Sequence, residues 1–319
     1  MIQVRIPATT ANLGPGFDCM GLALDLWNTF SLHLSGAPGS VRVETVGEGA
    51  TTLPTDATHL VARTMIDETW PGMLPTDTGI LIRCHNDVPA GSGMGSSSTA
   101  VLAGLIFASA LAAHALHRGD AQKVLETVQS TENMQRVLER AIKLEGHGDN
   151  VAPALLGGLI LVVPNGSAVV RRVEFSPLKV VVCVPDYKFL TVDARAALPT
   201  QYSKADAVFN IGHAVLVLEA LRTGDNALLA LGVADRIHEP YRIPLIPGAT
   251  EVRNAALQAG AIACVLSGAG PGLLAFSADR HAEIGQAMQS AFAAHGMRAR
   301  SWVLSAVERG TEIHPAPTM

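Results

Sequence analysis

The chain has 319 residues, which is enough for two modest domains or one large one with a buried core. Hydrophobic residues make up 48% of it and charged residues 16%, the profile of a compact enzyme of mixed helices and strands rather than a disordered chain. The net charge is -5 without clustered Lys and Arg, which argues against a nucleic-acid partner.

The N-terminal segment begins as a strand and continues as a loop. Residues 2–6 alternate apolar and polar side chains, and Pro7 is expected to end this strand. The stretch PATTANLGPGFD over 7–18 is rich in glycine, proline and small polar residues, which predicts a loop. In it, Asn12 and Asp18 offer an amide and a carboxylate suited to an ammonium or hydroxyl group of a small substrate. In isolation, Asp18 is more often a helix cap.

Strands and helices alternate in the following part of the chain. Strands are predicted over 41–46 and 79–85, with a helix over 59–68 between them. Two further helices are predicted, an apolar one over 98–116 and one with mixed charges over 121–144.

A loop rich in glycine and serine, VPAGSGMGSSST over 88–99, stands directly before the apolar helix. Glycine lets the backbone approach a ligand, and the N–H groups and dipole of a helix N-terminus favour an anion. The loop lacks the Lys of a Walker A motif, and Ser96 fills the third glycine position of GxGxxG, so both common nucleotide motifs are disfavoured. The alternative is a Ser-capped helix after a flexible turn. The residues of this candidate phosphate loop are Pro89, Ala90, Gly91, Ser92, Gly93, Met94, Gly95, Ser96, Ser97, Ser98 and Thr99.

A second polar loop, GHGDN over 146–150, stands before another apolar segment. Its polar side chains, His147, Asp149 and Asn150, lie between or beside glycines and are expected to face a cleft. A metal site of His147 with Asp149 is disfavoured because a third ligand at helical spacing is missing. A solvated turn is the commoner alternative.

The middle of the chain carries a candidate domain boundary. Residues 157–164 predict a short buried strand closed by proline, and Asn165-Gly166-Ser167 predicts a turn. We place the boundary there, giving domains 1–164 and 165–319. The tail from Gly310 is expected to be frayed. The second half again alternates, with predicted strands over 179–185, 263–267, 272–277 and 300–304 and helices over 205–222, 225–235, 250–259 and 282–295.

Two segments of the second half offer an arginine in a predicted loop, TVDAR over 191–195 and EPYR over 239–242. The planar fork of arginine suits a carboxylate, although either residue alone is more often a surface charge. A third glycine-rich segment, LSGAGPGLLAF over 266–276, predicts a tight hairpin between two apolar strands.

The spacing of the cysteines and the first residues of the chain are used to predict where in the cell the protein acts. The four cysteines stand tens of residues apart without a CxxC pair, so reduced thiols in the cytoplasm are expected and neither a zinc site nor a redox dithiol is indicated. No secretion signal is predicted after Met1. The most apolar stretch, 100–116, is shorter than the roughly 20 residues of a membrane span. We therefore expect a buried helix and no membrane partner.

Several of these segments together resemble the GHMP kinases. Residues 89–99 resemble the central phosphate-binding motif of that superfamily, with Met94 in place of the usual Leu. Residues 7–18 are similar to its first motif, in the form found in the branch that phosphorylates homoserine, and 266–276 are similar to its third. The sequence HGDNVAP at 147–153 is similar to a hallmark of the same branch. The resemblance covers nearly the whole chain.

The resemblance implies an α+β, two-domain GHMP kinase fold, with an N-terminal ribosomal-protein-S5-like α/β domain and a C-terminal ferredoxin-like α+β domain. It implies ATP as co-substrate, Mg²⁺, and phosphorylation of the side-chain hydroxyl of L-homoserine to O-phospho-L-homoserine, a step of threonine biosynthesis. A homodimer is a further expectation. The alternatives are a GHMP kinase for another small alcohol (mevalonate, shikimate or a sugar) and a non-catalytic GHMP-fold binding protein.

The resemblance also implies roles for single residues. Glu139, eight residues before His147, would hold magnesium together with Ser97. His59 stands where the family often has Asn, which leaves the nucleotide base open. The implied catalytic residues are Asn150, Glu139 and, as a candidate base only, Asp149. The implied substrate-binding residues are Asn12, Asp18, His147, Asn150, Thr191, Arg195 and Arg242.

Overall fold

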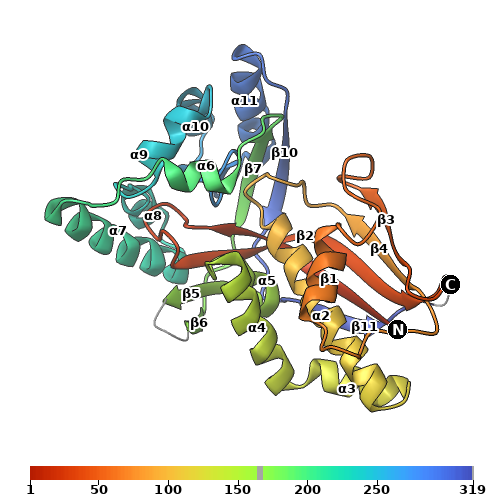
Figure 1. Ribbon diagram of the computed structural model, residues 1–319. Helices are drawn as coiled ribbons and strands as arrows, with labels where there is room; N and C mark the ends of the chain where they lie inside the picture. The colour runs from red at the N-terminus through yellow and green to blue at the C-terminus, as the bar shows by residue number, and fades with distance from the viewer. Residues whose placement is uncertain (164–167, 318–319) are drawn as a thin grey trace.

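The chain folds around two β-sheets, each with its own helices (Figure 1). The computed structural model describes residues 1–163 and 168–317. The strands of the first sheet are β1 (Ile2–Ala11), β2 (Met20–Leu34), β3 (Val41–Gly47), β4 (Ile80–Asn86), β5 (Leu159–Val163), β6 (Val169–Val173) and β11 (Glu312–Pro315). Their order is β11-β1-β2-β4-β3, with β5 paired to β2 and β6 paired to β5. The helices of this half are α1 (Leu60–Glu68), α2 (Ser96–Leu116), α3 (Ala121–Gln129), α4 (Thr131–Glu145) and α5 (Val151–Leu156).

The second sheet is antiparallel and has four strands, β7 (Lys179–Pro185), β8 (Ala263–Leu266), β9 (Leu273–Ser277) and β10 (Ala299–Ser305). Their order, β10-β7-β9-β8, corresponds to 4-1-3-2 along the chain, as in a ferredoxin-like sheet. The helices of this half are α6 (Thr191–Ala196), α7 (Lys204–Thr223), α8 (Asn226–Gly232), α9 (Glu239–Arg242), α10 (Ala249–Gln258) and α11 (His281–Ala294), with a 3₁₀ turn at Ile243–Leu245. The predicted α+β fold is confirmed.

Helix α2 forms the centre of the first core. By length and composition it could cross a membrane, but 72% of its most apolar window is buried inside the protein, as expected for a core helix. Leu102, Ile106 and Phe107 are fully buried in the same cluster as Phe30 and Ile82 of the sheet. Burying each such side chain contributes about 1.5–3 kcal/mol, so the N-terminus of α2 is held firmly in place.

Strand β1 continues beyond the position where the sequence predicts its end. The prediction that Pro7 ends the strand is wrong, because β1 reaches Ala11. Its pairing register with β2 shifts between Pro7 and Ala8, a bulge at which the missing N–H of proline is tolerated. The longer strand carries Asn12 to the point where the two halves of the chain meet.

Three further predictions concern the ends and breaks of elements. The single helix predicted over 121–144 is two helices, because Ser130 ends α3 and accepts a hydrogen bond from the backbone N–H of Asn133 to cap α4. The prediction of a frayed tail from Gly310 is wrong for residues 312–315, which form β11 and pair with β1. The turn predicted at 165–167 lies outside the described residues. Both β6 and β11 belong to the first sheet although they follow residue 164.

Candidate active site

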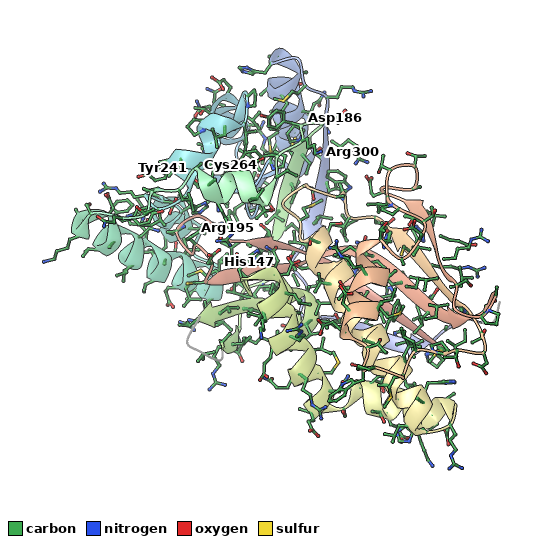
Figure 2. All side chains as sticks on the ribbon, viewed as in Figure 1. His147, Asp186, Arg195, Tyr241, Cys264 and Arg300 are labelled. Carbon is green, nitrogen blue, oxygen red and sulfur yellow. The ribbon has the colours of Figure 1, made fainter. Side chains whose placement is uncertain are left out.

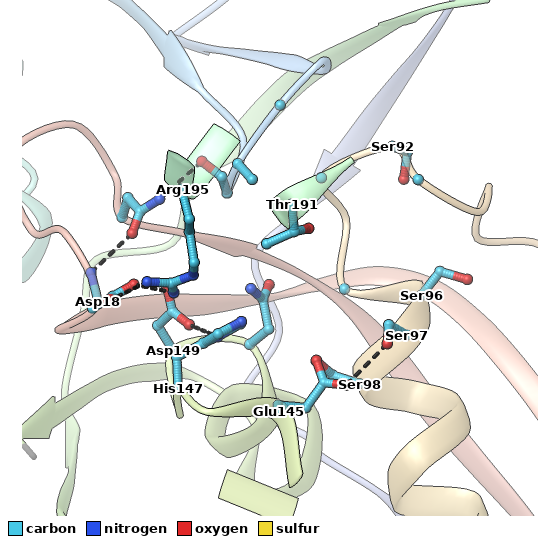
Figure 3. A pocket seen from close by; sticks show the side chains of 18 of the residues that line it. Asp18, Ser92, Ser96, Ser97, Ser98, Glu145, His147, Asp149, Thr191 and Arg195 are labelled. Carbon is cyan, nitrogen blue, oxygen red and sulfur yellow. Dashed lines mark hydrogen bonds and ion pairs between the residues drawn. The ribbon is translucent and has the colours of Figure 1, made fainter. Parts of the chain in front are cut away.

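A cavity of about 310 Å³ lies where the N-terminus of α2 faces loops of the second half (Figure 3). All seven predicted substrate-binding residues line it, together with Asp149 and seven residues of the predicted phosphate loop. The four other loop residues do not line this cavity: Met94 and Thr99 are buried, and Pro89 and Ala90 line an adjoining, wider one. The sequence therefore identified most of the wall of one site.

The phosphate loop ends in an open helix N-terminus. Gly95 is the N-cap residue of α2, with φ of 72°, and within the described chain no side chain caps the helix there. The first backbone N–H to bond within the helix is that of Thr99, which donates to the carbonyl of Gly95. The preceding N–H groups stay available, which disfavours the Ser-capped alternative and suits an anion such as phosphate.

Neighbouring segments fix the shape of this loop. Ser267, in the third glycine-rich segment, donates a hydrogen bond from its hydroxyl to the carbonyl of Gly93 (2.8 Å), and the N–H of Thr9 donates to the carbonyl of Met94 (3.1 Å). A Cβ on Gly93 would come within 2.1 Å of the Ser267 carbonyl oxygen, so only glycine permits the contact. The hairpin around 266–276 therefore packs against the phosphate loop.

A carboxylate lies against the serines of the loop, and it belongs to Glu145. The hydroxyls of Ser97 and Ser98 donate to its two oxygens, at 2.9 and 3.1 Å. Glu139, the predicted magnesium ligand and catalytic residue, does not line the cavity; it is exposed on α4 and accepts a hydrogen bond from Gln135. The two glutamates are six positions apart, about 9 Å along a helix, so the carboxylate beside the loop serines is that of Glu145 and not, as predicted, that of Glu139.

At the opposite end of the cavity two opposite charges lie side by side. Arg195, on α6, donates two hydrogen bonds to the carboxylate of Asp18, at 2.8 and 3.0 Å. The hydrogen bond and charge of Asp18 raise the pKa of Arg195. The side-chain oxygen of Asn12 accepts from the backbone N–H of Asp18 (3.0 Å), and the Asn12 amide donates to the carbonyl of Gly268 (2.8 Å). The N-terminal loop is thus tied to the second half.

A second arginine, Arg242, is buried at 1% exposure behind this pair. Burial lowers its pKa, and the nearby charge of Arg195 lowers it further. Its Nε donates to the carbonyl of Ala194 (3.2 Å), and its guanidinium lies 5.0 Å from the ring centroid of Phe17. The Phe17 ring also stacks on His238, at 5.2 Å between centroids. Among residues 1–163 and 168–317, the hydrogen-bond partners of Arg242 are the Ala194 carbonyl and His238, and no carboxylate pairs with it, so this buried guanidinium is suited to an anionic ligand.

The three polar side chains of the GHGDN loop, His147, Asp149 and Asn150, line the same cavity, as predicted. His147 donates from Nδ1 to a carboxylate oxygen of Asp149 (2.6 Å), and the Thr9 hydroxyl donates to the side-chain oxygen of Asn150 (2.8 Å). Burial alone would lower the pKa of His147, but the hydrogen bond and charge of Asp149 outweigh it and raise the pKa. Figure 2 places His147 and Arg195 near one another between the two halves of the molecule. Among the described residues, no group of three His, Cys, Asp or Glu side chains is placed to hold a metal ion.

Three residues at the site were not among the predicted site residues: Glu145, Phe17 and His238. Glu145 is the last residue of α4 and directly precedes the GHGDN loop. The prediction took the glutamate eight residues before His147, whereas Glu145 stands two residues before it. Phe17 stood inside the resembling N-terminal motif without an assigned role. His238, buried and hydrogen-bonded to the carbonyl of Gly14 (2.8 Å), had no sequence signal.

Fold and site together define a phosphotransferase. The chain belongs to the GHMP kinase family: the pattern described as "GHMP kinases N terminal domain" matches residues 57–158, and "GHMP kinases C terminal" matches residues 217–294. The resemblance seen in the motifs is therefore confirmed.

Individual relatives point to one member of that family. The chain is 40% identical to the homoserine kinase of Prochlorococcus marinus (strain MIT 9303), over 98% of this chain and 96% of the relative. It is 38% identical to the homoserine kinase of Desulfitobacterium hafniense, over 98% of this chain and all of the relative. The crystal structure of homoserine kinase from Cytophaga hutchinsonii matches with a TM-score of 0.77 and 31% identity, over 98% of this chain and 97% of that one. The mevalonate kinase of L. major, at 16% identity and a TM-score of 0.66 over 96% of each chain, shows the shared fold.

Proposed function

We propose that the chain transfers the γ-phosphoryl group of ATP to the side-chain hydroxyl of L-homoserine and produces O-phospho-L-homoserine, a step of threonine biosynthesis. The observation that carries the proposal is the pairing of opposite charges, Asp18 and Arg195, in the same cavity as an open helix N-terminus. A zwitterionic amino acid matches the charges, and a phosphate chain matches the helix end.

The phosphates of ATP are expected on the loop that precedes α2. Its free N–H groups and helix dipole stabilise negative charge, and the hydroxyls of Ser97 and Ser98 offer further donors. Phosphoryl transfer requires little covalent help from a protein, so positioning and charge neutralisation supply most of the catalysis.

The position of Glu145 supports the proposal that Mg²⁺ binds at the phosphate end of the cavity. Its carboxylate lies within hydrogen-bonding distance of Ser97 and Ser98, so a bound polyphosphate and Glu145 would repel each other unless a cation lay between them. Carboxylate and hydroxyl oxygens are ligands that Mg²⁺ prefers, and Glu145 with Ser97 would hold it. When bound, the ion would neutralise charge on the phosphates.

The other end of the cavity would orient the amino acid. Asp18 would accept the ammonium group, while Arg195, Arg242 and Thr191 would hold the carboxylate. This would direct the side chain of L-homoserine toward Asn150, which lines the same cavity and accepts a hydrogen bond from Thr9.

The reaction then follows from this placement. The hydroxyl oxygen attacks the γ-phosphorus in line, the bond from phosphorus to the β,γ-bridging oxygen breaks, and ADP leaves with that oxygen. Asn150 would hydrogen-bond the reacting hydroxyl. Asp149, held by His147, is our candidate for the group that takes up the hydroxyl proton. As an enzyme of amino-acid synthesis that uses ATP, the protein would act in the cytoplasm.

A panel of acceptors tests the proposal. ATP-dependent phosphorylation is measured with L-homoserine, L-serine, L-threonine, shikimate, mevalonate and galactose, with Mg²⁺ present and then chelated. A strong preference for L-homoserine that disappears on chelation is expected. Turnover of another acceptor in preference would overturn the substrate assignment, and tight ATP binding without any turnover would favour a non-catalytic protein.

A further inference from the structure

His238 is a buried histidine to which the proposed reaction assigns no role. It has 0% of its surface exposed and is the N-cap residue of α9, the short helix that carries Arg242. Its Nε2 lies 2.8 Å from the carbonyl oxygen of Gly14, and its Nδ1 lies 3.4 Å from Nη1 of Arg242. The ring therefore stands between the N-terminal loop and an arginine that is proposed to hold the substrate carboxylate.

The partners of this ring decide which of its nitrogens carries the proton. A carbonyl oxygen only accepts, so Nε2 must donate to Gly14, and the carboxylate of Asp235, 3.8 Å from Nε2, favours the same assignment. In the neutral imidazole Nδ1 then has a free electron pair. This electron pair accepts the hydrogen bond from Arg242, a side chain that can only donate. His238 thus offers Arg242 an acceptor that has no charge.

Neighbouring groups hold the backbone and the face of this ring. The buried carboxylate of Asp235 accepts hydrogen bonds from the three successive backbone N–H groups of residues 237–239, at 2.7–3.1 Å. Phe17 stacks on the ring, with 24° between the two planes. Because the backbone, one edge and one face of the imidazole are all held, the ring has little freedom to turn away from Arg242.

The contacts of Arg242 leave its charge available to a ligand. A guanidinium has five N–H donors. Among residues 1–163 and 168–317, Arg242 donates from Nε to Ala194 and from Nη1 to His238, so three donors remain for a carboxylate in the cavity. A carboxylate in the place of His238 would neutralise the guanidinium and compete with the substrate. A neutral acceptor orients the guanidinium and preserves its attraction for an anion.

We propose that His238 is a positioning residue, which aligns Arg242 for the carboxylate of the amino-acid substrate without cancelling the charge of the guanidinium. The proposal rests on the function proposed above, in which Arg242 binds that carboxylate. Its consequence is specific: the contribution of His238 to binding appears with ligands that carry a carboxylate and disappears with ligands that lack one.

Two substitutions of His238 separate the acceptor from the ring. His238→Phe keeps an aromatic ring and removes the acceptor, whereas His238→Asn keeps an acceptor, because Oδ1 of asparagine is as many bonds from the backbone as Nδ1 of histidine. KM is measured for ATP and for L-homoserine. Inhibition constants against L-homoserine are measured for 4-hydroxybutanoate, which keeps the carboxylate, and for 3-aminopropan-1-ol, which lacks it.

The expected effect of His238→Phe follows the carboxylate. The KM for L-homoserine and the inhibition constant of 4-hydroxybutanoate should each rise about 10–100-fold, since a hydrogen bond to a charged group is lost. The KM for ATP and the inhibition constant of 3-aminopropan-1-ol should stay unchanged. His238→Asn should recover most of the lost affinity, because its side chain again accepts from Arg242.

His213→Phe is the matched control. His213 also stacks on a phenylalanine ring, that of Phe209 at 3.8 Å between centroids, and donates to a backbone carbonyl, that of Gly232 at 3.2 Å. It does not line the cavity, so all four constants should equal those of the wild type. Melting temperatures of the three variants are compared with that of the wild type, so that a general loss of stability is recognised.

The tautomer of His238 is a second measurement, made by ¹⁵N NMR on the wild-type protein with the signal assigned by its absence in either variant. A proton on Nε2 and none on Nδ1 is expected. A proton on Nδ1, or equal losses for ligands with and without a carboxylate, would overturn the role of His238 and leave the proposed function standing. A wild-type protein that does not phosphorylate L-homoserine would overturn the proposed function, and this role with it.

Discussion

Replacing Glu145 by glutamine is the sharpest test of how the phosphate end works. The substitution keeps size and shape but removes the negative charge that accepts from Ser97 and Ser98. Hydrogen bonds to a charged group contribute about 1.5–3 kcal/mol, and residues that support a metal typically cost 10–100-fold when changed. We expect kcat/KM to fall about 100-fold at millimolar Mg²⁺, which is about 2.7 kcal/mol of transition-state stabilisation.

Glu139→Gln is the matched control on the same helix. Its carboxylate is exposed and, within the part of the chain that the structure describes, accepts one side-chain hydrogen bond, from Gln135, so activity should stay within about twofold of the wild type. Steady-state rates are measured for both variants across a range of Mg²⁺ concentrations, and raising Mg²⁺ should recover part of the activity of Glu145→Gln alone. Equal activity of the two variants, or a larger loss in Glu139→Gln, would refute the reasoning.

Three further predictions concern the rest of the cavity. Gly21→Ala places a Cβ 1.7 Å from the carbonyl oxygen of Asp149, so the GHGDN loop must move. A displacement of this order should lower kcat/KM about 100-fold. Unchanged kinetics would show that the position of this loop does not matter for catalysis. Asp18→Asn should raise the KM for L-homoserine about 10–100-fold and leave the KM for ATP unchanged, because the ammonium group loses its partner and Arg195, at the same end of the cavity, loses its ion pair. Equal changes in both KM values would contradict the assigned role. Burial, with the charges of Asp18 and Asp149, raises the pKa of Cys19, and burial raises those of the other three thiols to about 12, so iodoacetamide at pH 8 should modify the native protein far more slowly than the unfolded chain. Rapid labelling of one cysteine, detected by mass spectrometry, would contradict this.

Features encoded within a short stretch were predictable from the sequence. The phosphate loop is such a case, because its glycines and hydroxyls directly precede an apolar helix, and the structure has the open helix N-terminus expected there. The strand at 179–185 and the hairpin around 266–276 follow from local alternation and glycine in the same way.

Features that depend on contacts between distant segments were not predictable from the sequence. Glu145 accepts a hydrogen bond from Ser97, which lies 48 positions earlier in the chain. The number of residues between a glutamate and His147 does not show which carboxylate reaches the phosphate loop. Asp18 and Arg195 are 177 positions apart, so their pairing needed the fold. Residues 312–315 were predicted to be frayed because β1, the strand with which they pair, lies at the other end of the chain.

The central claim, that the cavity selects a zwitterion, is tested most directly by removing one charge of the substrate at a time. kcat/KM is measured for L-homoserine, for 4-hydroxybutanoate, which lacks the ammonium group, and for 3-aminopropan-1-ol, which lacks the carboxylate. Each loss leaves Asp18 or the arginine pair without its ligand, so we expect a decrease of about 100-fold or more for either analogue. If either analogue is phosphorylated as efficiently as L-homoserine, the charges at this end of the cavity do not determine the substrate, and the account is contradicted.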